Sequence, residues 1–468
     1  MNRRSFLSTA GTLVATSGFV PQLLAADEKS ATTGATAAAT GVPKLAPRFG
    51  DGRDWWFARR FGMFVHWGLY AIHGWHEQEQ WRRRIPRAEY QKLQQQWNPV
   101  NYNPEAWLDA AEAAGMKYIC LTTKHHDGFC LWDTKETDYN TMNTPYGKDV
   151  LKQLAEACHR RKFPLCLYFS IVDWHQPNYP NQDRHHELPP QPGDSPDWEK
   201  FMVFLKAQVR ELCTNYGEIH GFWWDMNVLK YQDPSVNAMI RQLQPNAVIN
   251  DRGFDAGDFG TPERDYSKEN EFLPAFAKRT EACQSIGMES WGYRRDEDYY
   301  ADRYIYASIA RYLARDANYL LNVGPMPDGT LAPATTGFLK RLGQWHHAVQ
   351  EALEGTAPAS HLTGNREVLL TRRGNTLYVI LYADPRGDAV KLKPISLLPR
   401  RATLLNTGAE ISCSIDLVPS EHGNQGRYLR LTHLPVNEYA NTVLVARLEF
   451  DELPEIINPP KESGASTA

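Results

Sequence analysis

The sequence predicts an α/β fold in which a TIM-like (β/α) barrel, complete or imperfect, is followed by a C-terminal β-sandwich. The chain has 468 residues, more than one hydrophobic core usually accommodates, so two domains are expected. Apolar, strand-like runs alternate with helical patterns through most of the chain. After about residue 355, short strand-like runs follow one another without helices between them.

Seven runs have the apolar character of buried parallel strands: Phe61 to Trp67, Tyr118 to Thr123, Leu165 to Val172, Gly221 to Trp224, Ala247 to Asn250, Ile286 to Trp291 and Tyr319 to Val323. Helical patterns separate them, at Pro104 to Ala114, Lys148 to Arg161, Asp197 to Thr214, Tyr300 to Asp316 and Thr335 to Ala352. Right-handed β/α units repeated over about 300 residues close most naturally into a barrel. An open doubly wound sheet is the alternative, but no Gly-x-Gly-x-x-Gly phosphate turn supports it.

The C-terminal runs are Glu367 to Thr371, Thr376 to Ala383, Ala402 to Leu405, Arg427 to Leu431 and Thr442 to Leu448. Strands joined directly by turns indicate a small β-sandwich. The predicted domains are therefore a catalytic barrel over 48–354, a β-sandwich over 355–451 and a disordered tail over 452–468.

The N-terminus predicts export. Residues 2–8 have the sequence Asn-Arg-Arg-Ser-Phe-Leu-Ser and precede a modest apolar run, so residues 1–26 resemble a twin-arginine signal peptide. A membrane anchor is the alternative, but glycines and a proline interrupt a run shorter than the ~20 apolar residues of a span. Residues 27–47, rich in Ala, Thr, Ser and Gly, are expected to form a flexible linker. The protein is thus expected in the periplasm or outside the cell.

Composition restricts the function classes. The net charge of −4, from 51 basic and 55 acidic residues, does not indicate nucleic-acid binding. Aromatic residues are abundant, with 14 Trp and 22 Tyr, and their flat rings can hold the apolar faces of sugars as well as fill cores. The seven cysteines include no Cys-x-x-Cys pair and cannot all be paired within the chain, so most are expected to be buried thiols.

Polar residues follow three of the predicted strands where the strands end. Asp225 ends the apolar run that begins at Gly221 and is the candidate nucleophile, although an Asp at this place also suits a helix N-cap. His66 follows the first strand, and His125 and His126 follow the second, where a nearby glycine permits the strand to break. Zinc binding by these histidines is a rival interpretation, but no His-x-x-x-His or His-x-His spacing supports it.

Two further acids, Glu263 and Glu281, lie in segments leading toward the predicted strand at Ile286. Glycoside cleavage requires one ionised carboxylate and one carboxyl that donates a proton to the leaving oxygen. A salt bridge with a neighbouring arginine or lysine is the structural alternative for either glutamate.

Several motifs, in order along residues 48 to 450, resemble the retaining α-L-fucosidases of glycoside hydrolase family 29. They are Phe61-Gly62-Met63-Phe64-Val65-His66-Trp67-Gly68-Leu69-Tyr70, Thr123-Lys124-His125-His126-Asp127-Gly128-Phe129, Asn250-Asp251-Arg252, Ser290-Trp291-Gly292-Tyr293 and Leu320-Leu321-Asn322-Val323-Gly324-Pro325. The resemblance implies an imperfect (β/α) barrel followed by a β-sandwich. It also implies hydrolysis of terminal α-L-fucosides, with a fucosylated glycan as substrate and neither metal nor organic cofactor.

By this resemblance Asp225 is the nucleophile, and the sugar is bound by His66, Glu77, His125, His126, Tyr168, Trp223, Arg252 and Trp291. The sequence departs from the family beside Glu77, because Gln78 stands where tryptophan is usual, with Trp81 close by. The acid/base is either Glu263, in a Thr-Pro-Glu segment, or Glu281, whose preceding residue is threonine rather than the common tryptophan. The resemblance favours Glu263.

Two rival functions remain on the same scaffold. One is an exo-glycosidase acting on α-L-galactosides, which differ from fucosides at C6. The other is a non-catalytic sugar-binding protein, since a fold alone does not confer activity. The presence of Asp225 favours catalysis, and the sequence indicates neither the oligomeric state nor the linkage preference.

Overall fold

The computed structural model describes residues 42–226, 233–264, 273–419 and 426–457. The predicted signal peptide, most of the predicted linker and the last part of the predicted tail lie outside these residues. Within them, no helix combines the length and apolarity needed to cross a membrane. All seven cysteines lie in the described part of the chain and are free thiols, six of them buried.

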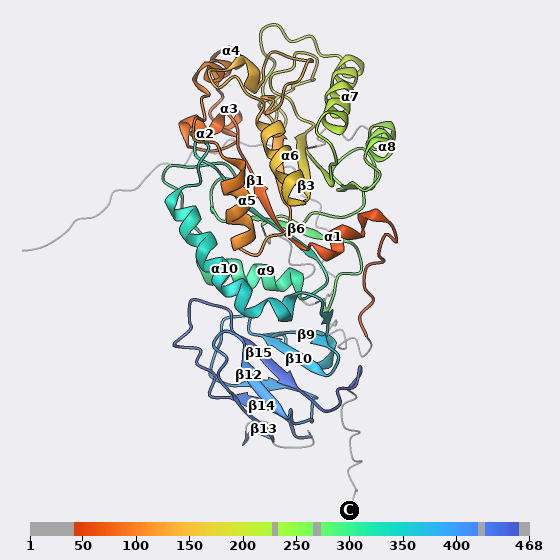
Figure 1. Cartoon of the computed structure of the whole chain (residues 1–468), viewed down its shortest axis with the longest axis vertical. Coiled ribbons are helices and arrows are strands. Elements are labelled where there is room, and N and C mark those ends of the chain that lie inside the picture. Colours follow the sequence, from red (N-terminus) through yellow and green to blue (C-terminus); the bar gives the residue numbers. More distant parts are fainter. Residues whose placement is uncertain (1–41, 227–232, 265–272, 420–425, 458–468) are drawn as a thin grey trace, which may run out of the picture. The chain divides into compact units, whose positions relative to one another are not determined.

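A seven-stranded parallel sheet forms the N-terminal part of the described chain, in the order β5-β4-β3-β2-β1-β7-β6. Figure 1 labels β1, β3 and β6 of this sheet. Its strands are β1 Phe61–Val65, β2 Ile119–Lys124, β3 Leu165–Ser170, β4 Gly221–Asp225, β5 Val248–Ile249, β6 Glu281–Ser285 and β7 Asn318–Val323. Strands β1 to β5 lie side by side in the order of the sequence, and β7 pairs with the other side of β1. This order is that of a curled, TIM-like sheet, which confirms the predicted fold class.

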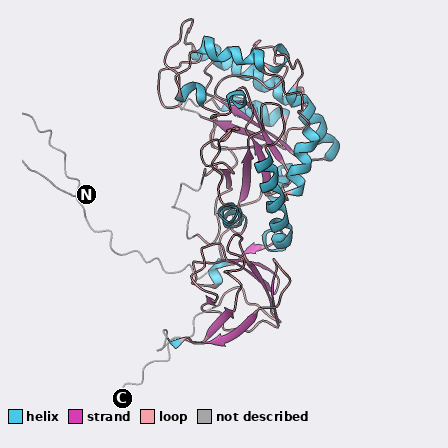
Figure 2. Ribbon diagram, turned by 90° about the vertical axis from the view of Figure 1, so that its left-hand side faces the viewer, coloured by secondary structure: helices cyan, strands magenta, loops and turns pink. Residues whose placement is uncertain are grey.

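Helices connect and cover these strands (Figure 2). They are α1 Trp55–Ala58, α2 Tyr70–His73, α3 Glu79–Arg82, α4 Arg87–Tyr90, α5 Pro104–Ala113, α6 Val150–Arg161, α7 Trp198–Thr214, α8 Pro234–Leu243, α9 Asp302–Leu313 and α10 Pro333–Leu353, with 3₁₀ turns η1 Gly52–Asp54, η2 Gln91–Gln96, η3 Thr141–Asn143 and η4 Ser360–Leu362. N-cap side chains begin four of the longer helices by accepting a backbone N–H of the first turn, namely Asn103, Asp149, Asp197 and Asp233.

Side chains alternate between the two faces of the sheet. Phe64, Tyr168, Trp223 and Leu320 belong to one buried cluster inside the curled sheet. Their strand neighbours on either side, such as Trp224, belong to the larger cluster that includes the buried helix residues. The period of two along each strand therefore assigns every second residue to the barrel interior, where side chains stack in layers.

The segment from Phe259 to Glu263 closes the gap between the edge strands β5 and β6. Its ends form parallel bridges, from Phe259 to Asn250 after β5 and from Glu263 to Cys283 in β6. The strand predicted at Ile286 to Trp291 is wrong, because β6 occupies Glu281–Ser285 and the residues after it form bends and turns. Glu281 is consequently the first residue of a strand and not part of a segment that leads to one.

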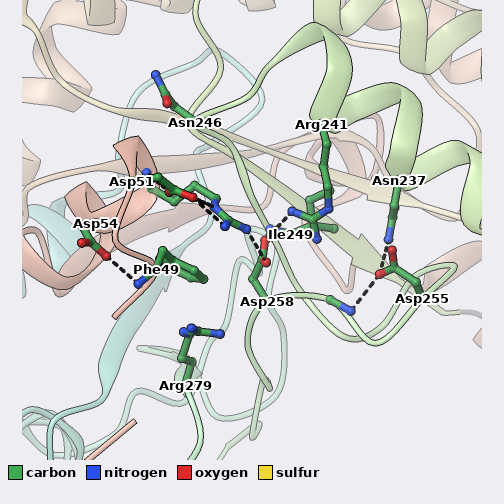
Figure 3. Close-up of polar contacts among 12 residues, drawn as sticks. Phe49, Asp51, Asp54, Asn237, Arg241, Asn246, Ile249, Asp255, Asp258 and Arg279 are labelled. Carbon is green, nitrogen blue, oxygen red and sulfur yellow. Dashed lines mark hydrogen bonds and ion pairs between the residues drawn. The ribbon is translucent and has the colours of Figure 1, made fainter. Parts of the chain in front are cut away.

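Asp258 fixes the start of this closing segment (Figure 3). Its carboxylate accepts hydrogen bonds from Arg53 Nη1 at 2.9 Å, Arg241 Nη1 at 3.0 Å and the backbone N–H of Ile249 at 2.9 Å. The same carboxylate thus joins the N-terminal turn, α8 and the edge strand β5. With Asp258 anchored, the chain that follows is directed along β6 toward Glu263.

Antiparallel strands make up the C-terminal part of the described chain. One sheet has the order β12-β15-β10-β9-β8 and the other β11-β14-β13, with bounds β8 Ala357–Pro358, β9 Leu369–Arg373, β10 Thr376–Ile380, β11 Val390–Leu392, β12 Arg401–Leu404, β13 Ser412–Asp416, β14 Tyr428–Thr432 and β15 Val445–Glu449. Alternate residues of these strands fill a separate apolar core. The short strands β8, β11 and β13 were not predicted, since two or three apolar residues between turns give no clear periodicity.

Candidate active site

A cavity opens where the strands of the parallel sheet end, with about 520 Å³ of empty space including its mouth. It is lined by Phe64, His66, Glu77, Gln78, His125, His126, Tyr168, His186, Trp223, Asp225, Met226, Arg252, Glu263, Cys283 and Trp291. All the predicted site residues except Glu281 are in this set. Ligands of parallel barrels bind at this end of the strands, so the cavity is the candidate active site.

Asp225 is the last residue of β4, and its carboxylate is held on both oxygens. Tyr168 donates its hydroxyl to Oδ2 at 2.7 Å, and Arg252 donates Nη1 to Oδ1 at 3.1 Å. Burial by itself raises the pKa of Asp225, but the Arg252 charge, His126 and the two hydrogen bonds outweigh it and hold the pKa below its ordinary value. Asp225 is therefore ionised at neutral pH, as a carboxylate nucleophile must be.

Arg252 also binds Glu263, so one guanidinium joins two carboxylates. Its Nη2 donates to Glu263 Oε2 at 3.0 Å and to the Thr261 carbonyl at 2.9 Å, and its Nε donates to Thr261 Oγ1 at 2.7 Å. The guanidinium carbon lies 4.7 Å from the centre of the Trp223 ring. Glu263 thus faces the same cavity as Asp225, while its side chain remains 35% exposed and within reach of water.

Glu281 lies beneath the cavity and is buried to 2% exposure. Its carboxylate accepts hydrogen bonds from Trp56 Nε1 at 3.2 Å, Tyr118 Oη at 2.7 Å and Trp223 Nε1 at 3.2 Å. Burial raises the pKa of Glu281 to about 7, against the effect of these donors. Cys283, two residues farther along β6, does line the cavity, so Glu281 belongs to the next layer of the barrel interior.

The three histidines are buried in the cavity wall and are neutral. Burial lowers the pKa of His66 to about 4 and lowers those of His125 and His126 as well. His66 Nδ1 lies 2.6 Å from Asn322 Oδ1, and His126 Nδ1 lies 2.7 Å from Ser170 Oγ. His125 Nδ1 is buried without a partner. A neutral imidazole offers one donor and one acceptor, which suits sugar hydroxyls.

Glu77 also lines the cavity and binds the loop that follows β6. Its Oε2 accepts hydrogen bonds from Ser290 Oγ at 2.8 Å, from the backbone N–H of Trp291 at 2.9 Å and from that of Gly292 at 3.3 Å. Burial opposes ionisation of this carboxyl, but His76 and His66, which are protonated at the low pH where Glu77 titrates, and the hydrogen bonds bring its pKa to about 2. Glu77 therefore fixes the loop after β6 that supplies Trp291, whose ring lies 5.2 Å from that of His66.

Several residues of the site were not predicted. Asn322 and Ser170 stood in the quoted or neighbouring segments, and both orient a histidine ring. His186 comes from the connection between β3 and α7, where the sequence has no pattern that marks it. Met226 lines the cavity directly after Asp225, with its backbone in the left-handed region at a φ of 58°.

The rival interpretation of a zinc site finds no support in the geometry. The described residues contain no group of three or more His, Cys, Asp or Glu side chains arranged to hold a metal ion. Instead, the arrangement offers an ionised carboxylate, a second carboxyl in the same cavity and neutral hydroxyl-binding groups. These are the components of carboxylate-catalysed glycoside cleavage.

Sequence relatives with known names match most of the chain. Tissue α-L-fucosidase of Homo sapiens is 26% identical over 416 residues, covering 81% of this chain and 85% of that protein. The α-L-fucosidase of Dictyostelium discoideum is 24% identical over 434 residues, covering 84% of this chain and 92% of that protein.

Solved structures are similar as well. α-L-Fucosidase isoenzyme 1 from Paenibacillus thiaminolyticus has a TM-score of 0.74 at 31% identity and covers 86% of this chain and 100% of its own. A family 29 α-L-fucosidase from Bacteroides thetaiotaomicron, trapped as a covalent intermediate with 2-fluoro-fucosyl fluoride in a glutamate-to-glutamine variant, has a TM-score of 0.72 at 26% identity, covering 88% and 99%. The family model for α-L-fucosidase matches residues 49–351. The chain belongs to the α-L-fucosidase family, glycoside hydrolase family 29.

Proposed function

We propose that this protein is an exo-acting, retaining α-L-fucosidase that removes terminal fucose from glycans by double displacement. The observation that carries the proposal is the pair of carboxylates on one guanidinium, Asp225 at 3.1 Å and Glu263 at 3.0 Å from Arg252, inside a cavity lined by neutral histidines. The trapped covalent intermediate of the Bacteroides thetaiotaomicron relative supports the same two-step course.

In the first step Asp225 attacks C1 of the fucose, while Glu263 protonates the departing glycosidic oxygen. Asp225 suits this role because Tyr168 and Arg252 keep it ionised and fix its orientation. In the second step Glu263 accepts a proton from water, which attacks C1 and releases fucose with retained configuration. The partial exposure of Glu263 supports this second task, since water must reach the acid/base.

Selectivity for fucose follows from the cavity wall. His66, His125 and His126 all line the cavity, and His125 Nδ1 is buried without a hydrogen-bond partner. A substrate lacking the hydroxyl that would pair with this nitrogen is therefore disfavoured. Trp291 offers an aromatic face for the C6 methyl group. An α-L-galactoside would place a hydroxyl at C6 and is the informative competitor substrate.

We further propose that the protein is exported through the twin-arginine route. The support is the Arg3-Arg4 pair followed by an apolar run within residues 1–26. Replacing both arginines with lysine should keep the protein in the cytoplasm, as measured by fractionation of cells that express the full chain. Unchanged export of the double variant would contradict this route.

Hydrolysis of an aryl α-L-fucoside tests the catalytic proposal. Wild type should release fucose whose first-formed anomer, followed by NMR, is α, and Asp225→Asn should lower kcat by about 10³-fold or more. Asp251→Asn is the matched control, because Asp251 is exposed in the same region and does not line the cavity. Activity retained in Asp225→Asn, or a β first anomer, would refute the mechanism.

A further inference from the structure

We propose that His186, stacked on Trp81, forms a subsite for the sugar to which the fucose is attached. This inference rests on the proposed function and extends it to the leaving group. Gln78 and His186 line the cavity side by side with the residues of the fucose site. Trp81 lies one turn after Gln78, and the His186 ring stacks on it.

The long connection between β3 and α7 holds His186 in place. The His186 ring stacks on the Trp81 ring with centroids 4.9 Å apart and planes 18° apart. Its backbone has a φ of 64°, the left-handed region, and its carbonyl accepts a hydrogen bond from Trp174 Nε1 at 2.8 Å. A non-glycine residue adopts this conformation only where its surroundings hold it there, so the contacts around His186 determine it.

The residue after His186 anchors this conformation. Glu187 is fully buried, and its carboxylate accepts hydrogen bonds from Arg184 Nε and Nη2, each at 2.7 Å, and from Tyr179 Oη at 3.1 Å. The connection is therefore built to present a histidine to the cavity.

The chemistry of His186 suits a hydroxylated ligand. Burial lowers its pKa to about 4, so the ring is neutral at pH 5 to 8. Its Nδ1 is buried without a hydrogen-bond partner. A neutral imidazole with free hydrogen-bonding capacity at a cavity is matched by a sugar hydroxyl, which both donates and accepts.

Depth in the cavity separates this subsite from the fucose site. His66, His125, His126, Glu77 and Tyr168 are at most 4% exposed and form the inner wall. By contrast, Gln78, His186, Met226 and Glu263 are half-buried, as is Asp225, so they line the more exposed part of the cavity, which begins at the bond that is cleaved. Because Glu263 protonates the leaving oxygen, the leaving group must pass this part of the cavity, where the His186 ring lies 6.0 Å from that of His126.

The test compares two leaving groups in His186→Ala and His186→Phe. One substrate is an aryl α-L-fucoside, which has no sugar hydroxyls in its leaving group, and the other is a panel of fucosylated disaccharides. Both variants should lower kcat/KM on the best disaccharide about tenfold, as expected for a lost hydrogen bond, and change the aryl fucoside less than about twofold. The inhibition constant of free fucose should stay unchanged and also shows that the site is folded.

Gln182→Ala is the matched control, since Gln182 is exposed in the same connection and does not line the cavity. It should keep the wild-type ratio between the two substrates. Recovery of disaccharide hydrolysis in His186→Phe would overturn the proposed hydrogen bond, and weaker inhibition by fucose would assign His186 to the fucose itself. An inactive wild type on the aryl fucoside would instead refute the proposed function, so the two failures are distinguishable.

Discussion

Replacing Glu263, the proposed acid/base, with alanine should remove that function while leaving the fold intact. A general acid or base contributes about 10²- to 10⁴-fold to a rate, equivalent to about 3–5 kcal/mol at 1.36 kcal/mol per tenfold. A fucosylated disaccharide has a poor leaving group, so Glu263→Ala should lose this whole factor on it. The stability cost should be below about 1 kcal/mol, because the ion pair with Arg252 is partly exposed.

An aryl α-L-fucoside with an acidic phenol separates the two steps in this variant. Such a leaving group departs without protonation, so hydrolysis of the fucosyl-enzyme becomes rate-limiting and its water lacks a base. Azide needs no base and can occupy the space that the truncated side chain leaves. Azide should therefore raise kcat of Glu263→Ala and yield fucosyl azide, detected by mass spectrometry.

Glu281→Ala is the matched comparison, with Glu281→Gln as a variant that preserves side-chain volume. Both should be insensitive to azide, because Glu281 does not line the cavity. Each should cost about 1–3 kcal/mol of the free energy of unfolding, since buried donors such as Trp223 Nε1 lose an acceptor. Azide rescue of Glu281→Ala, with none for Glu263→Ala, would refute the assignment from geometry.

Three further variants test the rest of the site. Arg252→Met should lower kcat/KM about 10²-fold. It should also move the acid limb of the pH profile to higher pH, because Arg252 lowers the pKa of Asp225. An acid limb at the wild-type pH would contradict this role. Asn322→Ala should raise the inhibition constant of fucose about tenfold by freeing the His66 ring, whereas an unchanged constant would show that packing alone orients it. Glu77→Gln should lose about 3 kcal/mol of unfolding free energy, measured in urea above pH 4.5, because the pKa of Glu77 falls from 4.5 to about 2 on folding. The difference from wild type should disappear as the pH falls toward 2. A difference independent of pH would contradict the low pKa.

The fold and most of the cavity were predictable because they depend on local patterns. Apolar runs bounded by helical segments identified the parallel strands, and Asp225, His66 and His125 stood at strand ends that a barrel brings to one face. The signal was strongest where a fully buried strand is also mostly apolar, as in β3 and β7.

The strand β6 was misplaced for a physical reason. Its sequence, Glu-Ala-Cys-Gln-Ser, is mostly polar, yet all five residues are buried. Partners distant in the sequence satisfy the polar groups, such as Trp56 for Glu281 and Asn322 for Ser285. Because buried strands are expected to be apolar, the strand was predicted at Ile286 to Trp291 instead. His186 was missed for a related reason, because its role depends on stacking against a ring more than one hundred positions earlier in the chain.

The two glutamates show why a perturbed pKa alone does not identify an acid/base. Glu281 has the pKa of about 7 that general acid catalysis favours, but burial beneath Trp223 produces it, and Glu281 does not line the cavity. Glu263 is bound to the same guanidinium as Asp225, the proposed nucleophile, lines the cavity and is partly exposed to water. A proton can be transferred only over hydrogen-bond distance, so position must be satisfied before acidity matters. The position of Glu263 follows from the closing segment that Asp258 anchors beside β6, so the closure of the barrel places this proposed acid/base in the cavity with Asp225.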